Sequence, residues 1–326
     1  MLLVTGGAGF IGSNVVAALN DARRADVAVC DFLGNDGKWR NLAKRQLADV
    51  VPPAELMQWL NGRKLDAIIH LGAISETTAT DGDLVIETNF RLSMRLLDWC
   101  TANSVPFIYA SSASTYGDGE QGFRDDASLD ALKKLRPMNL YGWSKHLFDM
   151  AVIERAAKGG KMPPQWAGLK FFNVFGPNEY HKGTMMSVLA RRFDDVKSGR
   201  VVQLFKSHRD GIADGDQRRD FIHVDDVVRV IMWLLATRSV NGIFNVGTGR
   251  ARSFRDLILA AYGALGVKPN IEYIDMPEQI RGSYQYFTEA EVDHLRGAGY
   301  NGGFTALEDA VGSYVRDFLD RPDRYR

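Results

Sequence analysis

The fold is decided by the stretch Leu2-Leu3-Val4-Thr5-Gly6-Gly7-Ala8-Gly9-Phe10-Ile11-Gly12, an apolar run that meets glycines at once. A strand followed by such a turn and then by a helical pattern is typical of a dinucleotide-binding site. Glycines lack a Cβ atom, so they permit a tight turn and the close approach of a phosphate, whose charge the N–H groups at the helix start can meet. The sequence therefore predicts a pyrophosphate site, rather than a merely structural turn, formed by Gly6, Gly9, Phe10, Ile11 and Gly12.

Outward from this turn, short apolar runs alternate with segments of helical period as far as residue 172. Runs that are apolar throughout are typical of strands buried on both faces, as in parallel sheets. Right-handed crossovers between such strands give a doubly wound arrangement. We therefore expect an α/β fold with a doubly wound parallel Rossmann sheet, whose strands are Leu2–Val4, Val27–Cys30, Ala67–Leu71, Phe107–Ala110 and Leu169–Phe172.

The second half of the chain is less regular, with a Gly/Pro-rich loop over 176–183 and a polar stretch over 207–217. Ile243–Val246 is expected to return a strand to the sheet. Three capping-box patterns predict short helices, and they are Ser253 with Asp256, Thr288 with Glu291, and Thr305 with Glu308. We expect residues 1–172 plus about 220–247 to form the nucleotide-binding domain. About 173–219 and 248–326 would form a smaller, partly interleaved α/β substrate-binding domain.

Composition excludes several classes of protein. The 326 residues are 45% apolar, and 40 Lys and Arg balance 40 Asp and Glu, so no global field would hold a nucleic acid. The apolar runs are far shorter than the ~20 residues of a membrane span. The two cysteines, Cys30 and Cys100, lie in apolar runs where buried free thiols are expected. We expect a soluble cytoplasmic protein without a metal site, a nucleic-acid partner or a membrane partner.

The residues after the second strand bear on the choice of cofactor. Asp31 follows Gly12 by 19 residues, close to the ~20 at which an acidic group meets the adenosine ribose, which favours NAD. Lys38 and Arg40 follow within reach of a 2′-phosphate, and a cation there would offset the carboxylate. The sequence leaves NADP and NAD both open, and a solvated loop is the alternative reading of the two cations.

Tyr141 and Lys145 lie four residues apart, on one face of a predicted helix. Lowering a phenol pKa from about 10 by about three units takes roughly 4 kcal/mol, which Lys145 and an oxidised nicotinamide could supply. Ser112 follows the fourth strand, at the carboxyl edge of the sheet where ligands bind. We expect Tyr141 to act as a base and Ser112 to donate to the reacting oxygen, although Ser112 could instead cap the strand end.

Three motifs, TGGAGFIG, SSASTYG and YGWSK in this order, resemble the extended short-chain dehydrogenase/reductase family of nucleotide-sugar-modifying enzymes. The similarity covers essentially the whole chain. Four later segments resemble the ADP-L-glycero-D-manno-heptose 6-epimerases within it. These are FFNVFGP (171–177), HKGTM (181–185), RDFIHV (219–224) and FNVGTG (244–249), and HKGTM is the most specific.

This resemblance implies a bound NADP that takes a hydride from C6″ of the heptose while a base removes the hydroxyl proton. The ketone then turns and is reduced on its other face, with Tyr141 and Lys182 acting from opposite sides of that carbon. It further implies Lys145 and Asn89 in the cofactor site, ADP-heptose as substrate, a role in lipopolysaccharide core biosynthesis and a homo-oligomer. The expected substrate contacts are Ser112, Asn173, Lys182, Thr184, Arg219 and Tyr284.

Two other readings stay open. An NDP-sugar 4-epimerase of the UDP-galactose epimerase type would share every motif up to Lys145, although Lys182 speaks against it. A non-catalytic NADP-binding sensor or scaffold protein would need no phenol and lysine pair. A 4,6-dehydratase is excluded, because the acid and base that it needs beside the serine are replaced by Ser112-Ala113-Ser114.

Overall fold

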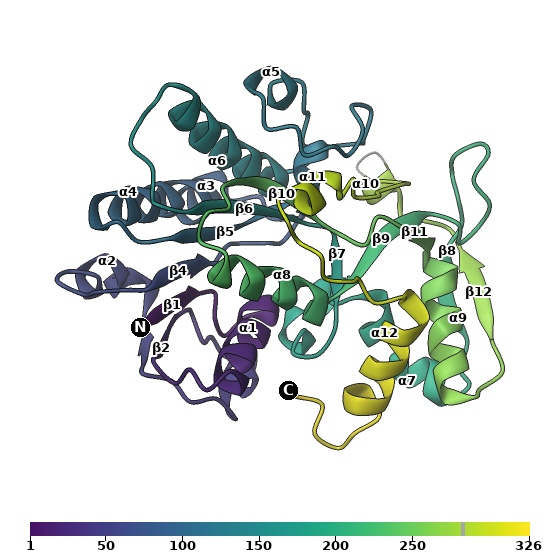
Figure 1. Cartoon of the computed structure of the whole chain (residues 1–326). Coiled ribbons are helices and arrows are strands. Elements are labelled where there is room, and N and C mark those ends of the chain that lie inside the picture. Colours follow the sequence, from purple (N-terminus) through teal and green to yellow (C-terminus); the bar gives the residue numbers. More distant parts are fainter. Residues whose placement is uncertain (282–283) are drawn as a thin grey trace.

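Seven parallel strands form the central sheet of the computed structural model, which describes residues 1–281 and 284–326 (Figure 1). Their order is β10-β6-β5-β4-β1-β2-β3. The direction of winding reverses between β1 and β4, which opens a crevice at the carboxyl ends of the strands, where ligands bind in such sheets. The strands are β1 (Leu2–Thr5), β2 (Val27–Cys30), β3 (Asp49–Val51), β4 (Ala67–His70), β5 (Phe107–Ser112), β6 (Trp166–Phe171) and β10 (Gly242–Val246).

Helices cover both faces of this sheet, because alternate residues of each strand point to opposite sides. Val4 and Val29 belong to a core with helices α1 and α8, whereas Leu3 and Ala28 belong to a core with α4 and α6. The prediction of a doubly wound α/β fold is thereby confirmed. The helices are α1 (Phe10–Asp21), α2 (Leu56–Trp59), α3 (Gly82–Ile86), α4 (Leu92–Asn103), α5 (Leu129–Leu132), α6 (Leu140–Ala157) and α8 (Val224–Ala236).

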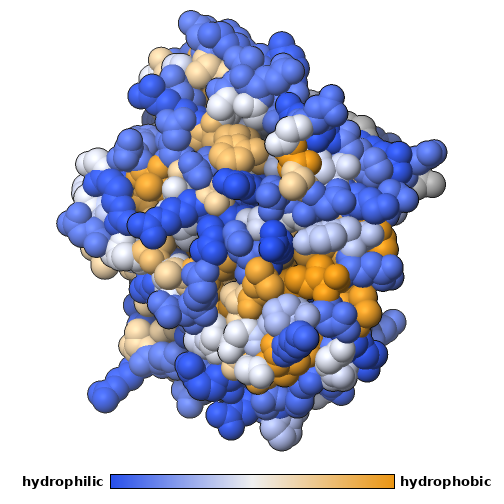
Figure 2. All heavy atoms as spheres, turned by 90° about the vertical axis from the view of Figure 1, so that its right-hand side faces the viewer, coloured by the Kyte–Doolittle hydropathy of each residue, from blue (hydrophilic) through white to orange (hydrophobic). Residues whose placement is uncertain are grey.

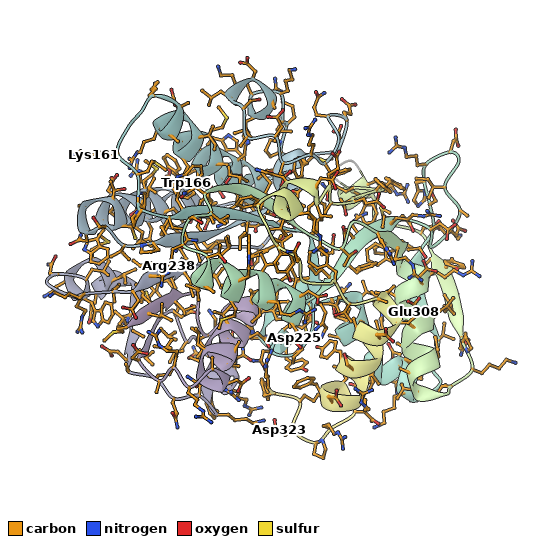
Figure 3. All side chains as sticks on the ribbon, in the orientation of Figure 1. Lys161, Trp166, Asp225, Arg238, Glu308 and Asp323 are labelled. Atoms are coloured by element: carbon orange, nitrogen blue, oxygen red, sulfur yellow. The ribbon has the colours of Figure 1, made fainter. Side chains whose placement is uncertain are left out.

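A smaller lobe, on the right-hand side of Figure 1, has an apolar core of its own. Strands β11, β9 and β7 form one sheet in that order, and β12 pairs in parallel with β8. Figure 3 shows side chains filling the space between these strands and their helices. The elements are β7 (Asn173–Phe175), α7 (Val188–Lys197), β8 (Val202–Phe205), β9 (Arg218–His223), β11 (Ala251–Ser253), α9 (Phe254–Leu265), β12 (Ile271–Ile274), α10 (Glu278–Arg281) and α12 (Leu307–Tyr314). Helix α11 (Asp293–Gly297) lies between them in sequence but packs against β10 of the main sheet.

The six predicted strands of the main sheet are all present, with ends that differ by at most a few residues. The sequence did not predict β3, because this edge strand has three residues of which only Val51 is buried. It also missed the strands of the small lobe. Their alternating burial, for instance over Val202–Phe205, is not a continuous apolar run.

Only one of the three predicted capping boxes forms. Ser253 Oγ accepts from the Asp256 N–H at 2.9 Å, and the Asp256 carboxylate accepts from the Ser253 N–H at 3.1 Å. The other two predictions were wrong, because neither Thr288 nor Thr305 caps a helix, although a helix follows each of them. Thr288 lies beside β9, five residues before α11, and Thr305 donates its hydroxyl to Asp226 instead of capping α12.

The domain boundaries remain a prediction. Strand β10 pairs with β6 in the main sheet and α8 packs against α1, as expected for part of the 220–247 segment. Strand β9, which spans the expected boundary at 220, pairs instead with β7 and β11 in the small lobe.

The face of the molecule on the side of the small lobe carries both hydrophobic and hydrophilic residues. Figure 2 shows apolar side chains gathered across the middle of this face, with hydrophilic ones above and below. Within residues 1–281 and 284–326, no helix has the length and apolar character that crossing a membrane requires. The same residues contain no group of three His, Cys, Asp or Glu side chains placed to hold a metal ion. Cys30 and Cys100 are buried and free.

Candidate active site

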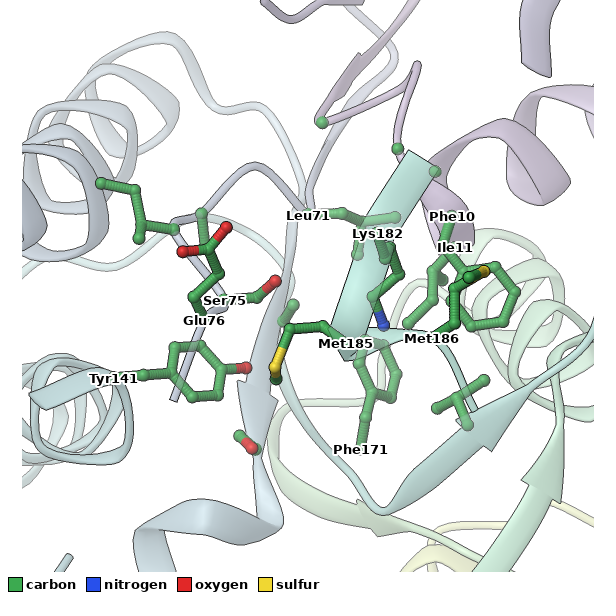
Figure 4. Close-up of a pocket in the computed structure, with 18 of the residues that line it drawn as sticks. Phe10, Ile11, Leu71, Ser75, Glu76, Tyr141, Phe171, Lys182, Met185 and Met186 are labelled. Carbon is green, nitrogen blue, oxygen red and sulfur yellow. The ribbon is translucent and has the colours of Figure 1, made fainter. Parts of the chain in front are cut away.

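A cavity of about 770 Å³ lies at the carboxyl edge of the main sheet and extends to the small lobe. Its walls come from the glycine turn before α1, the segment 71–76 after β4, the end of β5, the start of α6, β7 and the segment 181–188. Figure 4 shows labelled side chains from these segments facing one another across the cavity. All these segments follow strands or begin helices, so residues distant in sequence meet here.

The glycine turn has the shape that a pyrophosphate requires. Gly6 has a φ of +66°, and a Cβ there would lie 2.6 Å from the backbone nitrogen of Gly72, so only glycine fits. The N-cap residue of α1, Gly9, makes no side-chain cap, which leaves the first N–H groups of the helix free for an anion. The five residues predicted to bind the pyrophosphate, Gly6, Gly9, Phe10, Ile11 and Gly12, all line the cavity.

Asp31 and Lys38 meet at the cavity. One carboxylate oxygen of Asp31 accepts from the Ala8 N–H at 2.9 Å, and the other pairs with Lys38 Nζ at 2.7 Å. Both residues line the cavity, so the structure joins them at one place. Arg40 is exposed, lies over the ring of Trp39 and does not line the cavity.

Asn89, like Arg40, does not line the cavity, whereas the glycine turn, Asp31, Lys38, Tyr141 and Lys145 do. It is fully buried in a π-helical turn over Glu87–Arg91, where its side chain accepts from the Ile74 N–H at 2.8 Å. Its amide nitrogen donates to the Ile74 carbonyl at 2.9 Å and to Ser144 Oγ at 3.0 Å. Asn89 therefore holds the 71–76 wall against α6.

Tyr141 and Lys145 lie in the first two turns of α6, which begins beside the cavity because Asn139 caps it by accepting from the Gly142 N–H at 2.8 Å. Both residues line the cavity together with Ser112. Burial raises the pKa of Tyr141, and the hydrogen bond with Ser112 opposes that rise. Burial lowers the pKa of Lys145 to about 8.

The sequence-based expectation of a lowered Tyr141 pKa relies on an oxidised nicotinamide as well as on Lys145, so it stays a prediction. Among this chain's own groups, burial has the largest effect on that pKa and raises it. Asp149, two turns further along α6, adds to the rise. Its carboxylate is fully buried and accepts from Ser111 Oγ at 2.6 Å and from Lys170 Nζ at 2.8 Å. The neutral phenol is therefore the resting form.

Lys182 reaches the cavity from the side opposite Tyr141 (Figure 4). It lies in a short helical turn over Tyr180–Met185, and its Nζ stands 5.3 Å from the centre of the Phe10 ring. Burial lowers the pKa of Lys182, while Glu179 opposes that shift. Desolvation of this kind is what a lysine needs in order to act as a base near neutral pH.

The predicted substrate contacts divide into three groups. Asn173 lines the cavity on β7. Arg219 is buried beside the cavity residue Phe254, with its guanidinium 5.6 Å from that ring and 5.1 Å from the ring of Tyr284. Thr184 is exposed and does not line the cavity.

Some lining residues were not predicted from the sequence. Ser75 and Glu76 lie beside Tyr141 in Figure 4, on the segment that follows β4. Their position after a buried strand was a signal for the ligand edge of the sheet, but no motif singled them out. Met185 and Met186 lie near Lys182 in the same view. His181 also lines the cavity.

Comparison with known proteins places this fold and site in a family. Residues 2–247 match the model of the NAD dependent epimerase/dehydratase family. The chain belongs to this family, so the prediction of an enzyme with a nicotinamide cofactor and the resemblance to epimerases are confirmed.

More specific likenesses follow within the family. The chain is 47% identical to an ADP-L-glycero-D-manno-heptose-6-epimerase of Nitratidesulfovibrio vulgaris and 43% identical to one of Fusobacterium nucleatum, with full coverage of each chain. Its fold matches the Helicobacter pylori ADP-L-glycero-D-manno-heptose-6-epimerase with a TM-score of 0.80 and 27% identity, over 97% of this chain and 95% of that one. It also matches the Thermus thermophilus UDP-glucose 4-epimerase in complex with NAD, with a TM-score of 0.75 and 26% identity over 98% and 99%.

Proposed function

We propose that this chain is an epimerase that inverts C6″ of ADP-D-glycero-D-manno-heptose to give ADP-L-glycero-D-manno-heptose. Full-length relatives at 43% and 47% identity carry the name of that activity. The observation that carries the mechanism is the placement of Tyr141 and Lys182, which point into one cavity from opposite sides (Figure 4). When the ketone turns, its oxygen moves to the other side of the cavity, and a separate group on each side can then exchange the hydroxyl proton.

The chain's residues would divide the proton transfers as follows. The glycine turn and Lys145 would hold a nicotinamide cofactor, which would supply reversible hydride transfer at C6″, so the reaction would have no net oxidation. One of Tyr141 and Lys182 removes the C6″ hydroxyl proton, which leaves a ketone. After the ketone turns, the other residue supplies the proton to the oxygen on the opposite side. Ser112, which lines the cavity together with Tyr141, donates to the reacting oxygen.

Lys145 has a separate task in this mechanism. It lies one helical turn from Tyr141, on the same side of α6, and both line the cavity. As an ammonium it would stabilise the phenolate of Tyr141, which burial disfavours. We also assign it contacts to the nicotinamide ribose.

We propose NADP as the cofactor in use. The support is Lys38, whose ammonium stands 2.7 Å from an Asp31 oxygen at the cavity wall, where it would meet a 2′-phosphate. The other carboxylate oxygen of Asp31 accepts from the Ala8 N–H, so both oxygens of Asp31 have donors and the carboxylate would repel the phosphate less. NAD would leave Lys38 with Asp31 as its sole anionic partner.

We assign substrate recognition to residues at the small-lobe end of the cavity. Arg219 would meet the diphosphate of the nucleotide sugar, since a guanidinium held between two rings presents its donors in a fixed direction. Tyr284 and Asn173 would contact the substrate beside it. Thr184 would reach it only if its exposed turn moved inward.

The assembly, domain division and compartment are proposals of the same kind. We propose a homo-oligomer, supported by exposed large apolar side chains outside the cavity such as Phe32 and Trp143, which are 66% and 45% exposed. The nucleotide-binding and substrate-binding domains would meet at the cavity. Free buried thiols suit a reducing cytoplasm.

The experiment that tests this function begins with release of any bound cofactor from the purified protein and its identification by mass. Each C6″ epimer of ADP-heptose is then supplied, and the approach to a common mixture of both is followed. We expect NADP, interconversion of the two epimers, and no conversion of UDP-galactose. A protein that converts UDP-galactose instead would be a 4-epimerase, and one that holds its cofactor without turnover would be a sensor or scaffold.

A further inference from the structure

The loop that carries Lys182 is closed by one buried carboxylate. The loop runs from Gly176, after β7, to Ser187, the cap of α7. Glu179 accepts from the Gly176 N–H at 3.3 Å at one end of the loop, and from the Ser187 N–H at 2.5 Å and hydroxyl at 2.8 Å at the other. Tyr314 on α12 donates to the same carboxylate at 3.2 Å. Both ends of the loop are thus tied to one group.

Glu179 has no direct access to the reaction. Its side chain is fully buried, and it does not line the cavity. Burying a carboxylate costs free energy unless hydrogen-bond donors compensate for the lost hydration. An apolar side chain would fill the same space without this cost. The carbonyl of Glu179 also accepts from the Lys182 N–H at 3.0 Å, which makes Glu179 the start of the turn that presents Lys182.

We infer that Glu179 is a positioning residue for Lys182, and that with Tyr314 it fixes where the lysine ammonium stands in the cavity. The inference rests on the proposed function, in which Lys182 transfers a proton at C6″. Tyr314 belongs to the apolar core of the small lobe, so the position of Lys182 is set by that core rather than by the loop alone. A displacement of about 1 Å at a catalytic group can cost ~10²-fold in rate.

Replacing the Glu179 carboxylate with a neutral group should also change the pKa of Lys182. Glu179 raises the pKa of Lys182 against the effect of burial, so its replacement by an amide should lower that pKa further. The part of the pH–rate profile that reports the titration of Lys182 should therefore shift to lower pH. The other titratable groups around this pair are His181, Tyr180, Arg191 and Tyr314.

The test compares Glu179→Gln and Tyr314→Phe with the control Tyr262→Phe in the full chain loaded with cofactor. Tyr262 is a buried tyrosine of the same core whose hydroxyl donates to the Asn270 carbonyl, away from the loop. We measure kcat, KM, the pH profile, the melting temperature and the single-turnover oxidation of each C6″ epimer. Glutamine keeps the shape of Glu179 but replaces one of its two accepting oxygens with an NH2 group, which would face the N–H of either Gly176 or Ser187.

We expect Glu179→Gln to lower kcat by ~10–10²-fold with little change in KM, and Tyr314→Phe to lower it by a smaller factor. Oxidation of only the epimer that depends on Lys182 should slow. A purely structural role would slow both epimers equally, or would make Tyr262→Phe as harmful as Tyr314→Phe, and either result would overturn the inference. If Glu179→Gln fails to fold, Tyr314→Phe decides the matter by the same criteria.

The variant Lys182→Met separates this inference from the function on which it rests. If Lys182→Met turns over normally, the two-base function itself fails. If Lys182→Met is inactive while Glu179→Gln and Tyr314→Phe retain wild-type kcat and pH profile, only the positioning role fails.

Discussion

In the proposed mechanism the chemistry depends most on Tyr141, whose pKa is raised by burial. Tyr141→Phe should fold and keep its cofactor but lose at least ~10²-fold in kcat, because general-base catalysis is typically worth 10²–10⁴. Steady-state kinetics and cofactor extraction check both halves of this expectation. Turnover close to that of the wild type would remove Tyr141 from the mechanism.

The role that we propose for Lys145 predicts that this buried lysine lowers the stability of the protein. Burial lowers its pKa from 10.5 to about 8, so at pH 7 the folded protein holds a buried ammonium that the unfolded chain would solvate. Lys145→Met should therefore raise the free energy of unfolding at pH 7 by about 1–3 kcal/mol while activity falls. A variant less stable than the wild type at pH 7 would contradict this account.

The sign of the pH dependence provides a control for Lys145. Because its pKa is lower in the folded state, the unfolded state binds more protons between pH 8 and 10.5, and the wild type gains stability as the pH rises through that window. The advantage of Lys145→Met should shrink over the same range. Denaturant titrations at several pH values measure it.

Lys38 should set the preference between the two nicotinamide cofactors. Lys38→Ala should weaken NADP by roughly 1.5–3 kcal/mol, the worth of a charge-assisted contact, and NAD much less. Arg40→Ala is the matched control, since Arg40 is exposed and does not line the cavity. If calorimetric titrations show that NADP and NAD lose affinity equally, Lys38 only pairs with Asp31 and does not contact the 2′-phosphate.

Among the elements, α9 owes its start to the capping box of Ser253 and Asp256. Ser253→Ala should lower the free energy of unfolding by about 1 kcal/mol, within the range of 0.5–2 for lost caps. Ser198→Ala, an exposed serine after α7, should change it by only a few tenths. Thermal and denaturant unfolding compare the two, and equal losses would show that the box adds nothing to α9.

The elements also show where sequence patterns succeed and where they stop. A capping box is local, but its hydroxyl can be taken by another element, as Asp226 takes that of Thr305 across 79 residues. Likewise, Asn89 was expected to touch the cofactor, yet its partners are Ile74 and Ser144. Partners that far apart in sequence leave no periodic signal, so the pattern predicted the elements and not these contacts.

For the whole molecule, the main sheet was predictable because its strands are buried on both faces and read as continuous apolar runs. The small lobe was not, because strands such as β8 are half exposed and β9 joins a sheet of three short strands. The cavity lies where the main sheet meets the small lobe. Its glycine turn and the side that carries Tyr141 belong to the main sheet, and sequence motifs predicted both. The position of Lys182 in space depends on Glu179 and on α12, which no motif marks.

The central claim is that Tyr141 and Lys182 transfer protons on opposite faces of one carbon. The most direct test supplies each C6″ epimer in turn to Lys182→Met and to Tyr141→Phe, both loaded with oxidised cofactor, and follows nicotinamide reduction in a single turnover. Lys161→Met, at an exposed surface position (Figure 3), is the control for the substitution itself.

We expect each variant to lose oxidation of one epimer by at least ~10²-fold while retaining the other, with opposite preferences for the two variants. Epimerisation by Lys182→Met should be nearly abolished with little loss of substrate affinity. If Lys182→Met instead oxidises both epimers normally, or if saturating substrate restores its full turnover, Lys182 binds substrate without transferring a proton and Tyr141 serves both faces.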